Sequence, residues 1–293
     1  IQIADASLKV ARKLQIKTVL DLHENRPEIM KYYKHVTSFL GKLLISSKRW
    51  KKSEEKFVNL SDKVVVVTKE AKKELLTRCD KKNNEIIVYP NTVRQSFYKN
   101  KIINKEIKET YSNDFVMLYI GNTSKRRGLD TVLDSMNRIK KSVNNIKLII
   151  LGKSSYDNEL KKKINKLKLD SVVDFIGWVD ESDLYKYLLV SDVGISPLYS
   201  NLHHDTTYAN KLFQYMSFGV PIVCSDSKAQ ANLINENNCG VIFKNKNVND
   251  FTRVLLELIK NKSKLKTLGK NCQIAIDKLN NNQVSKDLIN IYA

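Results

Sequence analysis

The stretch that decides the fold is NKLFQYMSFGVPIVCSD, residues 210–226. It begins as a short amphipathic helix, turns at residues 219–221, and continues as a buried strand that ends at Ser225 and Asp226. In an open parallel sheet, ligands bind at the carboxyl ends of the strands. We therefore expect this segment to lie at a ligand-binding site.

Length and composition indicate a folded protein of two ordinary domains. The chain has 293 residues, of which 42% are apolar and 8% aromatic, and this composition excludes a disordered chain. No apolar run approaches the ~20 residues that a membrane-spanning helix needs. The first 24 residues lack the charged start, apolar block and cleavage site of a signal peptide. Their pattern is that of a helix and a strand from the interior of a domain, so we expect further residues upstream.

The net charge of +20 has two interpretations. It reflects either a solvated lysine-rich surface or an anionic partner, such as a membrane surface, nucleic acid or a phosphorylated substrate. The basic residues are densest in SSKRWKKSEEKF, residues 46–57, after the aromatic and aliphatic segment 31–44. This mixture suits an interfacial helix that faces anionic lipid. It equally suits a helix packed on the body of the protein.

Cysteines and histidines give no metal or disulfide pattern. The four cysteines show no paired spacing, and without a secretory signal we expect reduced thiols in a cytoplasm. The chain has no CxxC and no His-x3-His, which argues against zinc. His203, His204 and Asp205 are consecutive, and adjacent histidines rarely face one ion. We predict no bound metal. The cysteines are Cys79, Cys224, Cys239 and Cys272.

Short apolar strands alternate with helical stretches along most of the chain. This alternation predicts an α/β fold with parallel sheets covered on both faces. Helical periodicity is clearest over Thr131–Lys141, Tyr156–Leu167 and Glu181–Leu189. The predicted strands are Thr18–Leu22, Val64–Val67, Ile86–Tyr89, Phe115–Ile120, Ile146–Leu151, Val172–Ile176, Val193–Ser196, Pro221–Cys224 and Val241–Phe243.

A domain break is predicted after residues 89–91. Residues 93–112 are polar and poor in strands, and a new strand begins at Phe115. We therefore assign residues 1–92 to part of one α/β domain and residues 93–262 to a complete second domain. Residues 263–293 read as two helices.

Four loops that follow predicted strands carry polar or glycine-rich sequence. The loop 121–128, GNTSKRRG, opens a helix and brings three cations next to glycines. Glycine lets the backbone approach a ligand, and helix amino ends and cations favour phosphate. The loop matches neither a Walker loop nor GxGxxG. The other three loops are residues 21–24, 175–178 and 196–211.

The order of these segments resembles the two-domain (GT-B) retaining glycosyltransferases of group 1, often called family 4. DLHENRPE, at residues 21–28, resembles the family's D-x-H-E-x-x-P, and LYIGNTSKRRGLDTVLDSM, at 118–136, resembles its donor phosphate loop. The base-binding region is matched by VDFIGWVDESDLYKYLLVSDVGISPL at 173–198. YANKLFQYMSFGVPIVCSD, at 208–226, resembles the N-K-L-F-E-Y-M motif with its G-x-P and S-D.

The resemblance implies a fold of two Rossmann-like domains, the first incomplete, with the C-terminal helices bracing both. It implies transfer of a sugar from a nucleotide-sugar donor of UDP or GDP type, without cofactor or metal, to a glycan or lipid-linked acceptor. His23 and Arg127 take the catalytic roles. The donor-binding residues that it implies are Gly121, Arg126, Arg127, Gly177, Asn210, Lys211, Leu212 and Gln214.

Three positions depart from the family pattern. Gln214 replaces the glutamate that holds the ribose hydroxyls, Thr206 stands at the first glutamate of the pair, and Asn122 stands where many members carry arginine. A glutamine forms a weaker contact than a carboxylate does. The leading hypothesis is a cytoplasmic enzyme of surface polysaccharide or glycolipid synthesis, with peripheral binding to the inner face of the cell membrane as an open alternative. The alternatives are a catalytically weak nucleotide-sugar-binding or assembly subunit and, least favoured, a nucleic-acid binder.

Overall fold

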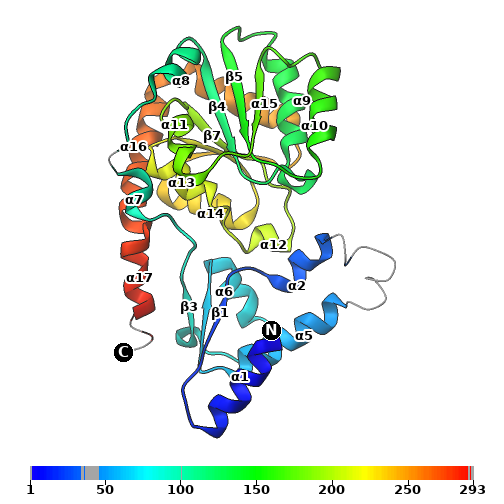
Figure 1. Ribbon diagram of the computed structural model, residues 1–293, viewed down its shortest axis with the longest axis vertical. Helices are drawn as coiled ribbons and strands as arrows, with labels where there is room; N and C mark the ends of the chain where they lie inside the picture. The colour runs from blue at the N-terminus through cyan, green and yellow to red at the C-terminus, as the bar shows by residue number, and fades with distance from the viewer. Residues whose placement is uncertain (1, 34–35, 37–45, 100, 290, 292–293) are drawn as a thin grey trace. The chain divides into compact units, whose positions relative to one another are not determined.

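The computed structural model describes residues 2–33, 36, 46–99, 101–289 and 291 (Figure 1). The chain forms two compact units. Unit 1 comprises residues 1–91, 201–208 and 284–293, and unit 2 comprises residues 92–200 and 209–283. Each unit is an α/β structure around a parallel sheet, so the predicted fold class is confirmed.

Unit 1 contains a three-stranded parallel sheet in the order β1 (Val19–Leu22), β2 (Lys63–Val66), β3 (Ile86–Val88). β-Branched residues dominate these strands, and Val58, Val64, Val66, Leu75 and Ile86 form the buried core beside them. The helices are α1 (Gln2–Lys13), α2 (Arg26–Ile29), α5 (Ser47–Leu60), α6 (Lys69–Leu76) and α12 (Leu202–Asp205), with 3-10 turns η1 (Met30–Tyr32) and η2 (Asn83–Glu85).

Unit 2 contains a six-stranded parallel sheet with helices on both faces (Figure 1). Its strand order is β6 (Val173–Gly177), β5 (Ile146–Leu151), β4 (Phe115–Ile120), β7 (Val193–Ser196), β8 (Ile222–Ser225), β9 (Gly240–Phe243). The helices are α7 (Gln95–Tyr98), α8 (Lys105–Thr110), α9 (Leu129–Ile139), α10 (Asp157–Lys166), α11 (Leu184–Leu188), α13 (Lys211–Ser217), α14 (Lys228–Asn237), α15 (Val248–Lys260) and α16 (Lys262–Leu279), with 3-10 turns η3 (Lys125–Arg127) and η4 (Glu181–Asp183). The last helix, α17 (Asn281–Ile289), begins in unit 2 and ends in unit 1.

The direction of chain winding reverses between β4 and β7. The chain passes from β4 to β5 and β6 on one side, then returns to β7, β8 and β9 on the other. β4 and β7 pair over only two residues, Met117 with Val193 and Leu118 with Gly194. Such a switch point opens a crevice at the carboxyl ends of the strands, which is where open α/β sheets bind ligands.

Tyr215 of α13 stabilises this switch point. Its hydroxyl accepts a hydrogen bond from the Ile120 amide at 3.1 Å and lies 2.9 Å from the Leu118 carbonyl oxygen and 3.2 Å from the Ile195 carbonyl oxygen. The ring is fully buried against Gly194, where a β-carbon would overlap it. The residue therefore satisfies backbone groups that the diverging strands leave unpaired.

All nine predicted strands are present, with each end within one residue of its expected position. The predicted helix Glu181–Leu189 is divided into η4 and α11, and the two C-terminal helices correspond to α16 and α17. Of the predicted interfacial segment, residues 34–35 and 37–45 lie outside the described part of the chain, while α5 covers most of 46–57.

The compact units divide the chain in a different way from the predicted domains at two places. Residues 201–208 belong to unit 1, although they lie within the predicted second domain. The first predicted C-terminal helix, α16, belongs to unit 2. That the C-terminal helices brace the two domains stays a prediction.

Candidate functional site

The loop that follows β4 depends on two glycines. Gly121 has φ +113° and Gly128 has φ +82°, a region of backbone conformation that side chains disfavour. At Gly128 a β-carbon would also overlap the Pro197 carbonyl oxygen. Between them, η3 holds three consecutive cationic residues, and α9 begins directly after Gly128. The sequence-predicted phosphate loop thus lies at the switch point of the sheet.

Lys211 points into the same place from the first turn of α13. Its side chain runs beside Gly121, where a β-carbon would lie 3.7 Å from the lysine Cε. The residue is only 5% exposed, and its Nζ lies 3.5 Å from the centroid of the Tyr119 ring. Among the described residues, Nζ has no hydrogen-bond partner. Burial lowers the pKa of Lys211 well below its usual value, and the Arg127 charge lowers that pKa further.

Arg127 is the second cation at this site without an internal partner. Its Nε is buried and has no hydrogen-bond partner among the described residues. Arg126 lies next to it, and both guanidinium charges act on the Tyr119 hydroxyl. A desolvated cation is costly unless an anion pairs with it. The buried Lys211 and the partly buried Arg127, around a glycine loop at a helix amino end, therefore form a site suited to a phosphate-bearing ligand.

The other predicted donor residues of unit 2 occupy varied environments. Gly177 ends β6 with φ +90°, and its α-carbon faces open space. Asn210 is exposed at the start of α13, whereas Leu212 is fully buried. Gln214 is half-buried, one helical turn from Lys211, and its side chain makes no hydrogen bond to a described residue. Contact of these residues with a donor stays a prediction.

His23 lies in unit 1, directly after β1. Its Nε2 is 3.0 Å from an Asp21 carboxylate oxygen, and its Nδ1 is 3.4 Å from the Asn91 side-chain oxygen. These contacts orient the imidazole at the carboxyl end of the strand. The ring lines an open cavity of about 320 Å³, together with Asp21, Glu24, Arg26 and Trp50 among others. The structure thus brings the polar cluster 21–24 together with the basic helix α5.

Thr206, at the position of the first family glutamate, is 97% buried within unit 1. Its carbonyl oxygen accepts a 2.8 Å hydrogen bond from the Thr68 hydroxyl, and its own hydroxyl bonds to the Leu202 carbonyl oxygen at 2.7 Å. The threonine therefore ties the segment 201–208 to the amino end of α6.

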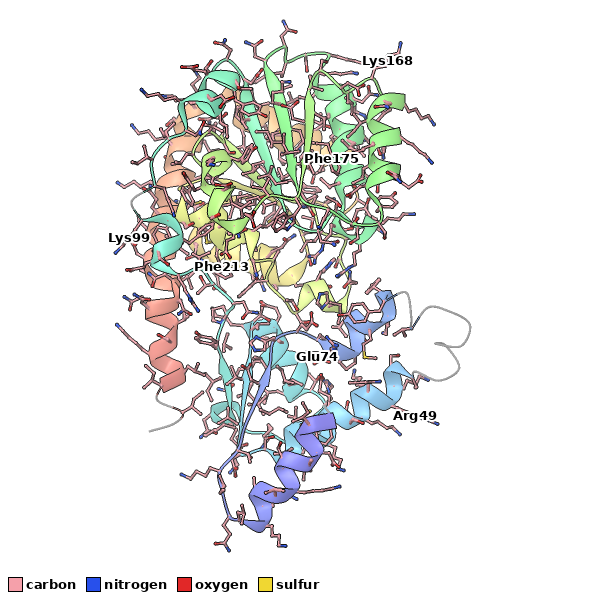
Figure 2. All side chains as sticks on the ribbon, viewed as in Figure 1. Arg49, Glu74, Lys99, Lys168, Phe175 and Phe213 are labelled. Atoms are coloured by element: carbon pink, nitrogen blue, oxygen red, sulfur yellow. The ribbon has the colours of Figure 1, made fainter. Side chains whose placement is uncertain are left out.

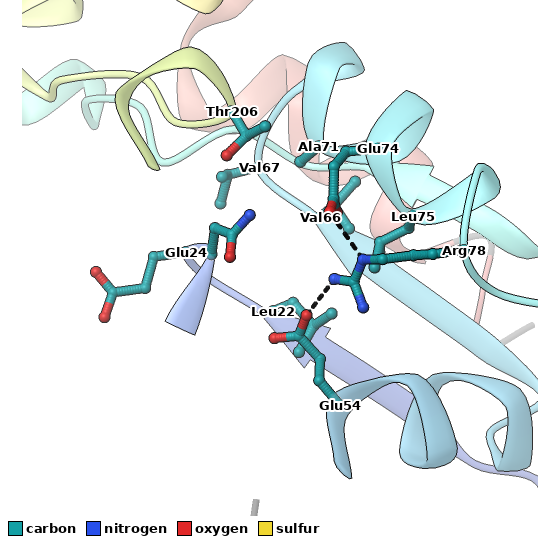
Figure 3. A pocket seen from close by; sticks show the side chains of 11 residues that line it. Leu22, Glu24, Glu54, Val66, Val67, Ala71, Glu74, Leu75, Arg78 and Thr206 are labelled. Carbon is teal, nitrogen blue, oxygen red and sulfur yellow. Dashed lines mark hydrogen bonds and ion pairs between the residues drawn. The ribbon is translucent and has the colours of Figure 1, made fainter. Parts of the chain in front are cut away.

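A second buried cation, Arg78, lies below Thr206 in unit 1 (Figure 3). It pairs with Glu54, with Glu74 at 2.8 Å and with Glu55 at 3.4 Å. Burial alone would lower the pKa of Arg78, but its hydrogen bonds to Glu74 and Glu54 outweigh burial and raise it. Burial raises the pKa of Glu54. The cavity beside this cluster measures about 20 Å³, which is room for about one water molecule.

The described residues offer no metal site and no membrane span. They include no group of three or more His, Cys, Asp or Glu side chains able to hold a metal ion. None of the described helices is long and apolar enough to cross a membrane.

Sequence reasoning missed Tyr119, Tyr215 and Gly194. Tyr119 occurs inside an apolar strand and Tyr215 on the apolar face of a helix, so both read as ordinary core residues. The signal that could have been used is a tyrosine at an otherwise apolar position, because a buried hydroxyl requires a hydrogen-bond partner.

The fold and the cationic loop define a site suited to a phosphate-bearing ligand. The family model described as "Glycosyl transferases group 1" matches residues 100–274, so the chain belongs to that family. Two relatives show how similar this chain is to curated members. "Uncharacterized glycosyltransferase MJ1059" of Methanocaldococcus jannaschii is 26% identical over 59% of this chain and 41% of its own length. "Alpha-monoglucosyldiacylglycerol synthase" of Acholeplasma laidlawii is 21% identical over 92% of this chain and 67% of its own length.

Solved GT-B structures share the fold. Anabaena Alr3699/HepE in complex with UDP superposes with a TM-score of 0.80 at 14% identity, covering 99% of this chain and 76% of that one. WaaG, a glycosyltransferase involved in lipopolysaccharide biosynthesis, gives a TM-score of 0.71 at 14% identity, covering 94% and 74%. This chain spans 41% to 67% of the length of the two curated relatives named above.

Proposed function

We propose that the protein is a retaining family 4 hexosyltransferase that uses a nucleotide-sugar donor. One observation carries the proposal. Lys211 is buried and Arg127 is partly buried at the switch point of the unit 2 sheet, and neither cation pairs with an anion among the described residues. A donor diphosphate has the charge and size to pair with both. Family membership and the UDP complexes of the HepE structures support a UDP-type donor.

In the proposed reaction the bond between the anomeric carbon and the diphosphate oxygen breaks. The acceptor hydroxyl oxygen forms its bond to the same face of that carbon, and its proton passes to the leaving diphosphate. Negative charge grows on the diphosphate in an oxocarbenium-like transition state. Arg127 and Lys211, with the amides at the start of α9, stabilise this charge most strongly when it is greatest. The family resemblance assigns a contact with the donor sugar to His23, whose ring is held by Asp21 and Asn91.

We infer that the acceptor is a glycan or glycolipid used in surface polysaccharide or membrane lipid synthesis. Two relatives named alpha-monoglucosyldiacylglycerol synthase support a lipid acceptor. On α5, Lys48, Arg49 and Lys52 form no ion pair with a described residue, whereas Lys51 pairs with Glu74 and Lys56 with Asp5. Figure 2 shows Arg49 at the outer surface of α5. These cations are available to an anionic membrane surface on the cytoplasmic side.

The alternative is a catalytically weak subunit that binds nucleotide sugar. The observation that favours it is Gln214, which replaces the ribose-binding glutamate of the family. A thermal-shift series with UDP-, GDP- and CMP-sugars tests donor binding, since a donor at about 100 times its Kd stabilises the folded state by ~2.7 kcal/mol. Hydrolysis of the stabilising donor separates the two functions. Binding without hydrolysis or transfer supports the subunit, and no shift with any donor contradicts both.

A further inference from the structure

Lys211 is an unusual buried amine because its surroundings disfavour its charged form. Its Nζ is withdrawn from solvent and lacks a hydrogen-bond partner among the described residues. The charged group that acts on it is Arg127, another cation. An ammonium group in this position would lie desolvated, beside a like charge and without an anion. Each of these conditions favours the neutral amine.

The Tyr119 ring is the one neighbour that opposes this preference. The ring face carries partial negative charge, and Nζ lies 3.5 Å from its centroid. Cation–π attraction to a ring is weaker than the cost of desolvating an ammonium group. The Tyr119 hydroxyl donates to the Asn122 carbonyl oxygen at 2.6 Å, which holds the ring under Lys211. Tyr119 therefore positions the amine without holding its proton in the free protein.

We propose that Lys211 is a neutral amine in the free protein and takes up one proton from solvent when a nucleoside diphosphate binds. The inference rests on the proposed function, because it requires the diphosphate to lie at the loop 121–128. Opposite charge within about 4–6 Å favours the charged form of a lysine by one to three pKa units. The same ligand pairs with Arg127 and so cancels the like charge that acts on Lys211.

The coupling has a measurable consequence for affinity. Between the pKa values of Lys211 in the free and the bound protein, each rise of one pH unit weakens diphosphate binding about tenfold, since one proton is taken up per ligand bound. An arginine side chain is not deprotonated in proteins, and burial raises the pKa of Tyr119. Lys211 is thus the group at this site that changes its protonation in the alkaline range.

Isothermal titration calorimetry of the whole chain with UDP, and in parallel with GDP, tests the inference. Titrations at pH 7.5, 8.0 and 8.5, below the range in which the ring N–H of uracil or guanine ionises, are each run in two buffers of different ionisation enthalpy and give the number of protons taken up. We expect net uptake of up to one proton, with affinity falling as pH rises. The second ionisation of the nucleotide phosphate, with a pKa near 6, makes no contribution there. Binding without proton uptake at all three pH values overturns the inference but leaves the proposed function intact.

Variants assign the proton to Lys211. Lys211→Arg keeps a permanent cation, so we expect UDP binding without proton uptake and with a flat pH profile. Lys211→Met serves where arginine does not fit, and we expect weaker binding that is also independent of pH over this range. Tyr119→Phe keeps the ring and should retain the uptake. Uptake that persists in Lys211→Arg, or is lost in Tyr119→Phe, assigns the proton elsewhere and overturns the inference. If neither nucleotide binds the parent protein, both the inference and the proposed function fail.

Discussion

Arg78 in unit 1 and Lys211 in unit 2 are both cations withdrawn from solvent, yet their surroundings are opposite. Arg78 pairs with Glu54 and Glu74 (Figure 3) and also with Glu55, and these carboxylates neutralise it within the fold. Lys211 meets an aromatic ring and another cation, and no described carboxylate pairs with it. A fold can bury a charge for its own stability only if it supplies the counter-charge. This contrast supports our proposal that Lys211 belongs to a binding site, whereas Arg78 stabilises the fold of unit 1.

The largest expected effect is the loss of stability when Arg78, the cation paired within the fold, is replaced. Arg78→Met should lower the free energy of unfolding of unit 1 by about 3–5 kcal/mol, because Glu54 is left buried and uncompensated. Urea unfolding followed by fluorescence measures it. Each unit holds one of the two tryptophans, so a Trp178→Phe background isolates the Trp50 signal of unit 1.

The double variant Arg78→Met with Glu54→Met is the matched control. Replacing both members of a buried pair with apolar residues should recover most of the loss. A loss below about 1 kcal/mol in the single variant would mean that the cluster behaves like a surface ion pair, and the contrast with Lys211 would be removed.

Lys48, Arg49 and Lys52 of α5 form a third class: they are exposed cations that pair with no described residue. Replacing Lys48, Arg49, Lys51 and Lys52 with serine should weaken binding to vesicles that contain anionic lipid. Three of the four have no ion pair to a described residue, and each contributes about 1 kcal/mol near such a surface, so the expected loss is about 100-fold. Co-sedimentation at low and high salt measures it. Equal sedimentation of parent and variant would identify α5 as a packed helix only.

Arg127→Ala tests whether the cations at the loop 121–128 bind the donor phosphates. Loss of a charge-assisted contact of about 1.5–3 kcal/mol should lower turnover about 10- to 150-fold. Steady-state kinetics with the donor found in the thermal-shift series measures the change, and the exposed Lys125→Ala in the same turn is the control. Unchanged kinetics in a folded Arg127→Ala protein would reject this location for the donor phosphates.

The pH dependence of stability separates Lys211 from Arg78. The pKa of Lys211 is lowered on folding, so the unfolded chain holds more protons between the folded value and about 10.5. Without ligand, the stability of the parent relative to Lys211→Met should therefore rise with pH by up to about 1.4 kcal/mol per unit across that window. Urea unfolding at pH 7.5, 8.5 and 9.5 gives the slope. A difference that does not vary with pH would show a charged Lys211 in the free protein.

The smallest effect is expected at Gln214. Gln214→Glu should bind donor at least as tightly as the parent, within about tenfold, because a carboxylate accepts ribose hydroxyls more strongly than an amide does. Lys211, one helical turn away, offsets part of the cost of desolvating the new charge. Gln214→Ala is the matched control. If neither variant changes donor affinity in the calorimeter, Gln214 does not contact the nucleotide.

Sequence by itself determined the strands, the parallel α/β class and the glycine-rich basic loop after Phe115–Ile120. The hydrophobic periods of strands (two residues) and helices (3.6 residues) are local properties, as is the need for glycine in a left-handed conformation. They can therefore be recognised directly in the sequence. Only the tertiary structure decided that Tyr119 lies under Lys211, that Tyr215 closes the β4–β7 seam, and that residues 201–208 belong to unit 1. These features depend on which distant side chains share a volume and on which buried charges find counter-charges. The solvent exposure and the pKa of a side chain depend on all the groups that surround it in the folded protein. Most of these groups are distant in the sequence, so the sequence alone does not reveal them.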